Sequence, residues 1–165
     1  MTALTDLKRL VECESPTEDL VACNQVVDLA IEITNSLLKV KAEKVIENGR
    51  PVYWWGSKSP KIVLLCHIDT VWPKGSFTPS WQVNGDVATG PGVFDMKAGF
   101  IQALYSLVGI EHLEYQVALV ATTDEETGSA TSKDLIARLA KAADAVLVFE
   151  ASLDGKVKTG RKGTA

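Results

Sequence analysis

The chain has 165 residues and a formal net charge of −4, and 46% of its residues are hydrophobic and 23% charged. This composition predicts a single globular domain with a substantial core. The acidic balance, without a Lys/Arg cluster, excludes nucleic acid and anionic membranes as the main partners, and no apolar run is long enough to cross a bilayer. The N-terminus lacks the pattern of a signal peptide, and three cysteines without CxxC spacing indicate reduced thiols, so we expect a cytoplasmic protein.

The first 38 residues predict two helices. Apolar residues recur at helical spacing over residues 4–11. A second helix is expected to begin at Ser15, which can cap it, because Pro16 suits the first helical position and Glu18 completes a capping box. Its apolar pattern extends to about residue 38.

A β-hairpin is expected next. Two strand-like segments, 40–47 and 52–55, are joined through Asn48-Gly49, which is a strong signal for a tight turn. Trp54 and Trp55 are neighbours in the second strand and must therefore face opposite sides of the sheet.

The segment 62–66 has five apolar residues without alternation, which predicts a strand buried on both faces. The strand leads into His67 and Asp69, which lean to the same side of an extended backbone because they are two residues apart. Open α/β sheets bind ligands just past the carboxyl ends of such strands. The pair is therefore a candidate metal ligand with the carboxylate that orients it. Cys66 points to the opposite face and is expected to pack in the core.

A glycine-rich loop, Gly90-Pro91-Gly92, brings the chain to Asp95 at the start of a helix expected over residues 98–108. The loop matches neither the GxGxxG nor the Walker pattern, so it does not predict a nucleotide site. Lys97 is interpreted as a residue of the helix start.

Two further strands are expected to end in carboxylates. Residues 117–121 form a buried-strand run that leads into Asp124-Glu125-Glu126, followed by a helix over residues 129–140. Residues 145–149 form another, which leads into Glu150. Adjacent carboxylates repel one another and cost stability unless cations compensate. A solvated acidic turn is the alternative interpretation of the run.

Together these features predict an α/β fold with a mostly parallel central sheet flanked by helices. One histidine and several carboxylates, without a thiolate, would meet at one edge of the sheet. This donor set suits Zn²⁺, Mn²⁺ or Co²⁺. A two-metal hydrolase needs a bridging carboxylate, separate ligands for each metal and a general base, and the set has members for each role.

Four motifs then resemble those of a known family. They are His67-Ile68-Asp69-Thr70-Val71, Gly90-Pro91-Gly92-Val93-Phe94-Asp95-Met96-Lys97, Thr123-Asp124-Glu125-Glu126 and Val148-Phe149-Glu150. In this order and with these gaps they resemble the co-catalytic zinc peptidases and deacylases. That family includes glutamate carboxypeptidase, acetylornithine deacetylase, succinyl-diaminopimelate desuccinylase and aminoacylase, and the chain is most similar to the glutamate carboxypeptidase branch.

The resemblance implies a set of ligands that holds two divalent metal ions. The ions are expected to be Zn²⁺, with Co²⁺ or Mn²⁺ as alternatives. His67 and Glu150 would hold one ion, Glu126 would hold the other, and Asp95 would bridge the two. The family also implies a cis peptide between Asp95 and Met96.

The catalytic roles implied by the resemblance fall to Asp69 and Glu125. Asp69 would orient His67 through its second ring nitrogen. Glu125 would be the general base that deprotonates the attacking water and later protonates the leaving amine. His112, the other histidine, lies in no motif and is expected at the surface.

The resemblance further predicts that residues 1–165 are the N-terminal portion of a metallopeptidase catalytic domain. The lid and dimerisation domain, the rest of the catalytic domain and a further His ligand of the second metal would be absent. We therefore expect an incomplete second site, little activity from this chain alone, and self-association or a homo-oligomer through exposed apolar surface.

The expected activity is metal-dependent hydrolysis of amide bonds, of the carboxypeptidase or N-acyl-amino-acid deacylase type. The substrate would be a small peptide or an N-acyl amino acid. The alternative is a non-catalytic metal-binding or interaction module that retains the family core.

Overall fold

The computed structural model describes residues 2–152 and 154–160. Its longer helices are α1 (Ala3–Glu12), α2 (Leu20–Leu37), α3 (Ala98–Ser106) and α4 (Lys133–Ala142). Three short helical turns are η1 (Val93–Lys97), η2 (Leu113–Tyr115) and η3 (Glu125–Thr127). The strands are β1 (Glu43–Glu47), β2 (Arg50–Gly56), β3 (Ile62–His67), β4 (Gln82–Asn84), β5 (Val87–Thr89), β6 (Val117–Thr122) and β7 (Ala145–Val148).

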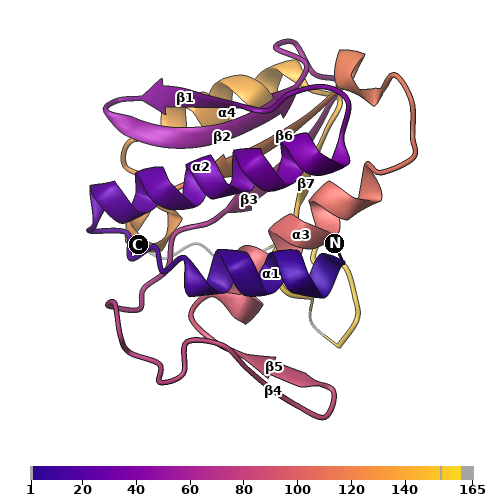
Figure 1. Ribbon diagram of the computed structural model, residues 1–165. Helices are drawn as coiled ribbons and strands as arrows, with labels where there is room; N and C mark the ends of the chain where they lie inside the picture. The colour runs from indigo at the N-terminus through magenta and orange to yellow at the C-terminus, as the bar shows by residue number, and fades with distance from the viewer. Residues whose placement is uncertain (1, 153, 161–165) are drawn as a thin grey trace.

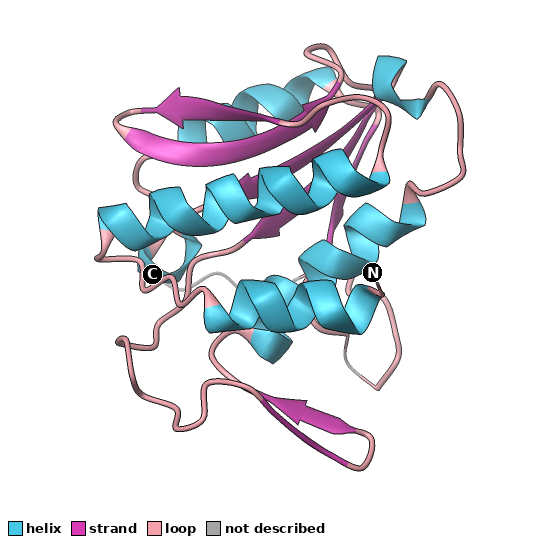
Figure 2. Ribbon diagram, in the orientation of Figure 1, coloured by secondary structure: helices cyan, strands magenta, loops and turns pink. Residues whose placement is uncertain are grey.

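A five-stranded sheet with the order β1-β2-β6-β3-β7 forms the centre of the structure (Figure 2). Strands β6, β3 and β7 are parallel, and the β1–β2 hairpin adds two antiparallel strands at one side. This arrangement confirms the predicted α/β fold. It also aligns the carboxyl ends of the three parallel strands at one edge of the sheet.

Helices cover the two faces of this sheet unequally. The larger core packs α1, α2 and α3 against the face that carries Trp55, whereas α4 packs against the face that carries Trp54 (Figure 1). The two tryptophans thus lie in different cores, as their alternation predicts. Leu135 and Leu139 supply the contact of α4, and burying each contributes about 1.5–3 kcal/mol.

The Asn48-Gly49 turn forms as predicted. Its φ angles are 47° and 84°, and a two-residue turn of this kind requires positive values at both positions. The strand before it begins at Glu43, three residues later than expected. A second, isolated hairpin, β4–β5, extends from the lower side of the molecule in Figure 1.

The predicted start of the second helix at Ser15 is wrong. Helix α2 begins at Leu20, and its cap is Asp19, whose side chain accepts a hydrogen bond from Ala22 N at 2.9 Å. The Ser15 hydroxyl donates instead to the carbonyl of Ile68 at 2.6 Å, and Thr17 donates to Asp69. The side chains that would have capped a helix therefore hold residues 15–17 against the end of β3.

Strand β7 is an edge strand, whereas its apolar sequence predicted a strand buried on both faces. It pairs with β3 alone, and Leu147 and Val148 are 50% and 55% exposed. Among the described residues no helix is long and apolar enough to cross a membrane. Cys66 is a buried free thiol, consistent with its predicted packing in the core, and Cys23 is also buried and free.

Candidate metal centre

The carboxyl ends of the parallel strands deliver the predicted site residues to one place. His67 is the last residue of β3, Glu125 and Glu126 lie in the turn η3 after β6, and Glu150 follows β7. Asp95 reaches the same place from η1. The structure therefore brings together the four predicted ligands and the predicted base.

His67 is buried and is held on its Nδ1 side by Asp69. Nδ1 lies 3.2 Å from the backbone carbonyl of Asp69 and 3.4 Å from its Oδ1 atom. Both are acceptors, so Nδ1 carries the proton in this arrangement. Nε2 of a neutral imidazole is then an acceptor that faces the centre of the site.

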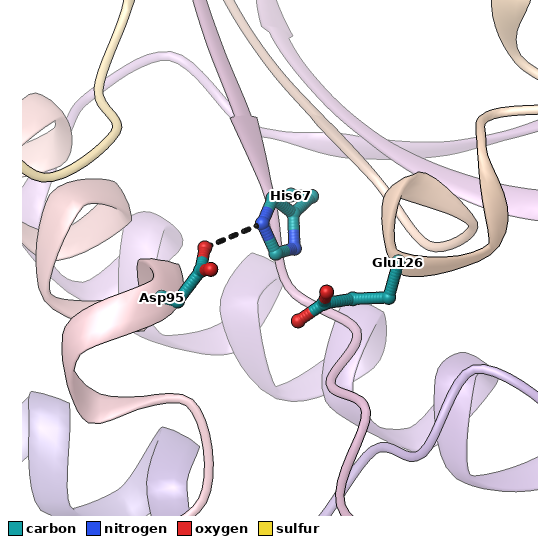
Figure 3. A group of neighbouring side chains, drawn as sticks. All are labelled: His67, Asp95 and Glu126. Carbon is teal, nitrogen blue, oxygen red and sulfur yellow. Dashed lines mark hydrogen bonds and ion pairs between the residues drawn. The ribbon is translucent and has the colours of Figure 1, made fainter. Parts of the chain in front are cut away.

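Carboxylates surround Nε2 on the other side of the ring. The nearest oxygens of Asp95, Glu150 and Glu125 lie 3.0, 3.5 and 3.8 Å from Nε2. Figure 3 shows Asp95 and Glu126 on either side of the His67 ring, and one ligand atom from each of these three residues lies within 4.8 Å of the others. An aromatic nitrogen and carboxylate oxygens in such a group can hold a divalent cation.

The electrostatics of the site reflect this crowding. Burial opposes protonation of His67, but Asp69, Glu150 and Glu125 outweigh it and raise the pKa of His67 to about 11. Burial raises the pKa of Glu125 and of Glu126, His67 opposes both shifts, and neighbouring carboxylates such as Asp95 add to them. The shift at His67 arises because carboxylates gather beside the ring, whereas burial is the main cause of the shifts at the two glutamates. The donor set thus fits a divalent ion, which would replace the proton on Nε2.

Asp124, the first residue of the acidic run, has a different environment from the two residues after it. Its carboxylate accepts hydrogen bonds from the backbone N–H and the hydroxyl of both Thr131 and Ser132, at 2.6–3.1 Å. Burial opposes its ionisation, but these bonds outweigh burial and lower the pKa of Asp124. Asp124 therefore ties the turn η3 to the start of α4, at Lys133 rather than residue 129. The sequence offered a signal for this role in the paired hydroxyls seven and eight residues later.

The segment that carries Asp95 is fixed at both ends. Gly92 has φ 73°, and a Cβ atom there would approach Thr70 Cγ2 to 2.6 Å, so glycine is needed for this close passage. The peptide between Asp95 and Met96 is cis, as the resemblance implies. Lys97 is fully buried, and its Nζ donates to the carbonyls of Leu10 and Cys13 at 2.9 and 3.1 Å.

Sequence reasoning missed the roles of Lys97, Thr17 and Arg50. Thr17 Oγ1 donates to Asp69 Oδ2 at 2.7 Å, which leaves Oδ1 facing His67. Arg50 donates to the backbone carbonyls of Thr17 and Thr123, so it connects residues 15–17 to the end of β6. His112 lies at the surface, as expected.

Comparison with known proteins gives concordant results. The chain is 37% identical over 117 residues to Carboxypeptidase G2 from Pseudomonas sp. (strain RS-16), a match that covers 67% of this chain and 28% of that protein. An M20 family metallo-carboxypeptidase from Sulfolobus solfataricus superposes with a TM-score of 0.71 at 22% identity, covering 93% of this chain and 38% of that one. Human carnosine dipeptidase 1 superposes with a TM-score of 0.61 at 17% identity, covering 88% and 37%.

Carboxypeptidase G2 supports the resemblance seen in the four motifs, the two solved structures share the fold, and the chain spans less than two fifths of the length of each. The family model for peptidase family M20/M25/M40 matches residues 63–163, which is more than half of the chain and includes every predicted site residue. The chain therefore belongs to peptidase family M20/M25/M40.

Proposed function

We propose that this chain carries the metal-binding part of an amide-bond hydrolase. The observation that carries the proposal is the environment of His67 Nε2, an acceptor in the Nδ1–H tautomer that faces the oxygens of Asp95 and Glu150 at 3.0 and 3.5 Å. Without a metal, a proton on Nε2 lies between the ring and these oxygens, and a divalent ion held by the same atoms would take its place. Membership of a peptidase family supports hydrolysis as the use of that cation.

The proposed ligands divide between two divalent ions, Zn²⁺ in the first instance, with Co²⁺ or Mn²⁺ as alternatives. His67 and Glu150 would hold one ion, Glu126 would hold the second, and Asp95 would bridge them. Among the described residues only the first ion has a nitrogen ligand. We therefore propose that this chain binds the first ion more tightly than the second.

Divalent ions held by these residues would lower the pKa of water and polarise an amide carbonyl. Glu125 accepts the proton of the attacking water and passes it to the nitrogen of the leaving amine as the C–N bond breaks. Glu125 suits both steps because its carboxylate lies beside the proposed ligands, 3.8 Å from His67 Nε2, without being one of them. Asp69 keeps the proton on Nδ1 of His67, so that Nε2 remains available as a ligand.

The proposed substrates are small peptides or N-acyl amino acids. Support comes from Carboxypeptidase G2 and from the metallo-carboxypeptidase and dipeptidase whose folds this chain shares.

Titration of Zn²⁺ into chelator-treated protein, followed by calorimetry, tests the ligand set. The wild-type chain should bind at least one ion with proton release, and Glu150→Gln should weaken that binding by tenfold or more, on the order expected when one ligand of a metal is lost. Glu111→Gln is the matched control, because Glu111 is an exposed acid paired with Lys39 and lies outside the site. Equal binding by the two variants would contradict the assignment.

Hydrolysis assays separate the enzyme from the non-catalytic alternative. Metal-loaded protein containing this chain should cleave a panel of N-acyl amino acids and dipeptides, lose turnover in chelator and regain it with added metal. Tight, specific metal binding without turnover across the panel would instead favour a metal-binding module.

A further inference from the structure

A cavity of about 250 Å³ lies at the end of the sheet opposite to the metal centre. It opens between residues 37–40, at the end of α2, and the segment 107–116, which connects α3 to β6 (Figure 1). That segment leads into the first residue of β6, whereas the metal centre lies past the last residues of β3 and β6. The six residues of β6 separate the two places by about 20 Å, so a small ligand in the cavity is remote from the proposed metal ligands.

Much of the cavity lining is apolar, and Trp55 is its largest side chain. Trp55 and Leu107 belong to the larger core, and both are buried. The indole N–H of Trp55 donates to the carbonyl of Val40 at 3.1 Å, so the polar atom of the ring is already satisfied. The apolar residues that line the cavity are Leu37, Leu38, Val40, Trp55, Leu107 and Ile110. An aromatic or aliphatic group placed there would lose contact with water and gain contact with these side chains.

The charged residues of the lining leave one negative charge unmatched. Lys39 pairs with Glu111 at 3.4 Å, and both side chains are largely exposed. Glu114 is half-buried, and its carboxylate has no ion pair or hydrogen bond within the part of the chain that the structure describes. Lys39 can neutralise only one of the two glutamates, so the lining attracts a cation and repels an anion.

We propose that this cavity binds a small organic amine, with its apolar body against Trp55 and Leu107 and its ammonium group beside Glu114. A neutral ligand of the same shape would leave the charge of Glu114 unmatched, and an anionic one would add to it. An inorganic cation would leave the apolar lining in water. The site is separate from the proposed hydrolysis, and it binds its ligand whether or not a metal is present.

Four probes test the charge and the apolar body separately: benzylamine, benzyl alcohol, benzoate and methylammonium. Nuclear magnetic resonance titration at pH 8, where histidine is ordinarily neutral, follows the Trp55 indole N–H and the Gly109 amide. Benzylamine should shift both signals and bind about fivefold more tightly than benzyl alcohol, the order of magnitude that a solvent-accessible ion pair contributes. Benzoate and methylammonium should bind at least about tenfold more weakly than benzylamine, because one has the wrong charge and the other has no ring.

Glu114→Gln should reduce the affinity for benzylamine to that for benzyl alcohol, which should itself change little, because the variant removes the charge and keeps the shape. Asp86→Asn is the matched control, since it removes the same charge from an exposed position in the turn of the β4–β5 hairpin, outside the cavity. Equal affinity of the wild-type chain for benzylamine and benzyl alcohol, or an unchanged preference in Glu114→Gln, would overturn the proposal. So would shifts at the amide of Glu126 without shifts at Gly109, because they would place the amine among the carboxylates of the metal centre instead.

Discussion

Replacing Thr17 tests how the surroundings of His67 are held in place. Thr17 Oγ1 lies 2.7 Å from Asp69 Oδ2 and 3.3 Å from the carbonyl of Thr70. A hydroxyl has one proton to donate, and the shorter bond to a carboxylate is the stronger one. Both Thr17 and Asp69 are buried. Thr17→Val therefore removes a hydrogen-bond donor from Asp69 Oδ2, a carboxylate oxygen that water cannot reach. The donor that remains for this oxygen is the backbone N–H of Glu126, at 3.3 Å.

Thr17→Val should lower the free energy of unfolding by about 2 kcal/mol, because a hydrogen bond to a charged group usually contributes about 1.5–3 kcal/mol. For a domain of this size that corresponds to a melting temperature lower by about 4–8 °C. Denaturant and thermal unfolding of the metal-free chain measure both quantities. Affinity for Zn²⁺ should also fall by about ten- to a hundredfold, because Asp69 orients the His67 ligand.

Thr17→Ser is the matched control, since it keeps the hydroxyl and loses only one methyl group, worth about 0.8 kcal/mol. The order of stability should be wild type, Thr17→Ser, Thr17→Val. A Thr17→Val protein as stable as Thr17→Ser, with unchanged Zn²⁺ affinity, would show that the Thr17–Asp69 bond does not support the site.

Three further outcomes are expected. In metal-loaded protein containing this chain, Glu125→Gln should lower turnover by about 10²–10⁴-fold while Zn²⁺ affinity changes little, because it removes the proposed base and no ligand. Retained turnover in steady-state assays would exclude Glu125 from that role. Burial lowers the pKa of Lys97 to about 8, below its usual value of 10.5, so the unfolded chain binds more protons between these values. Wild-type stability should therefore rise with pH relative to Lys97→Met across that window, by about 3 kcal/mol in urea unfolding; parallel curves would contradict a buried, titrating lysine. The exposed edge strand β7 should promote self-association, and Val148→Lys should suppress it. Light scattering that finds the wild-type chain monomeric at high concentration would refute this role of β7.

Sequence patterns predicted those features of the fold that depend on near neighbours. The Asn48-Gly49 turn, the strand 62–66 and the alternation of Trp54 and Trp55 each follow from local backbone and side-chain geometry, and each is present. The gathering of the site residues also followed, because parallel strands share one carboxyl edge.

Long-range contacts explain the errors. Ser15 and Thr17 form a plausible helix start, yet their hydroxyls bond to residues more than 50 positions later, and that competition moves the start of α2 to Leu20. Lys97 has the sequence context of a helix start, and only the approach of the last carbonyls of α1 makes its burial tolerable. The apolar run of β7 could not show that the strand has a neighbour on one side alone.

The acidic run 124–126 shows how one stretch of sequence can carry both structural and chemical roles. Asp124 receives four hydrogen bonds from Thr131 and Ser132, which stabilise its charge within the protein. The carboxylate of Glu126 has no ion pair or hydrogen bond within the described part of the chain. Glu125 lies near His67 at 3.8 Å, and the pKa of each glutamate is raised. Because repulsion among these carboxylates opposes folding when no cation is bound, a bound divalent ion should stabilise the native state through the same residues that would use it in hydrolysis.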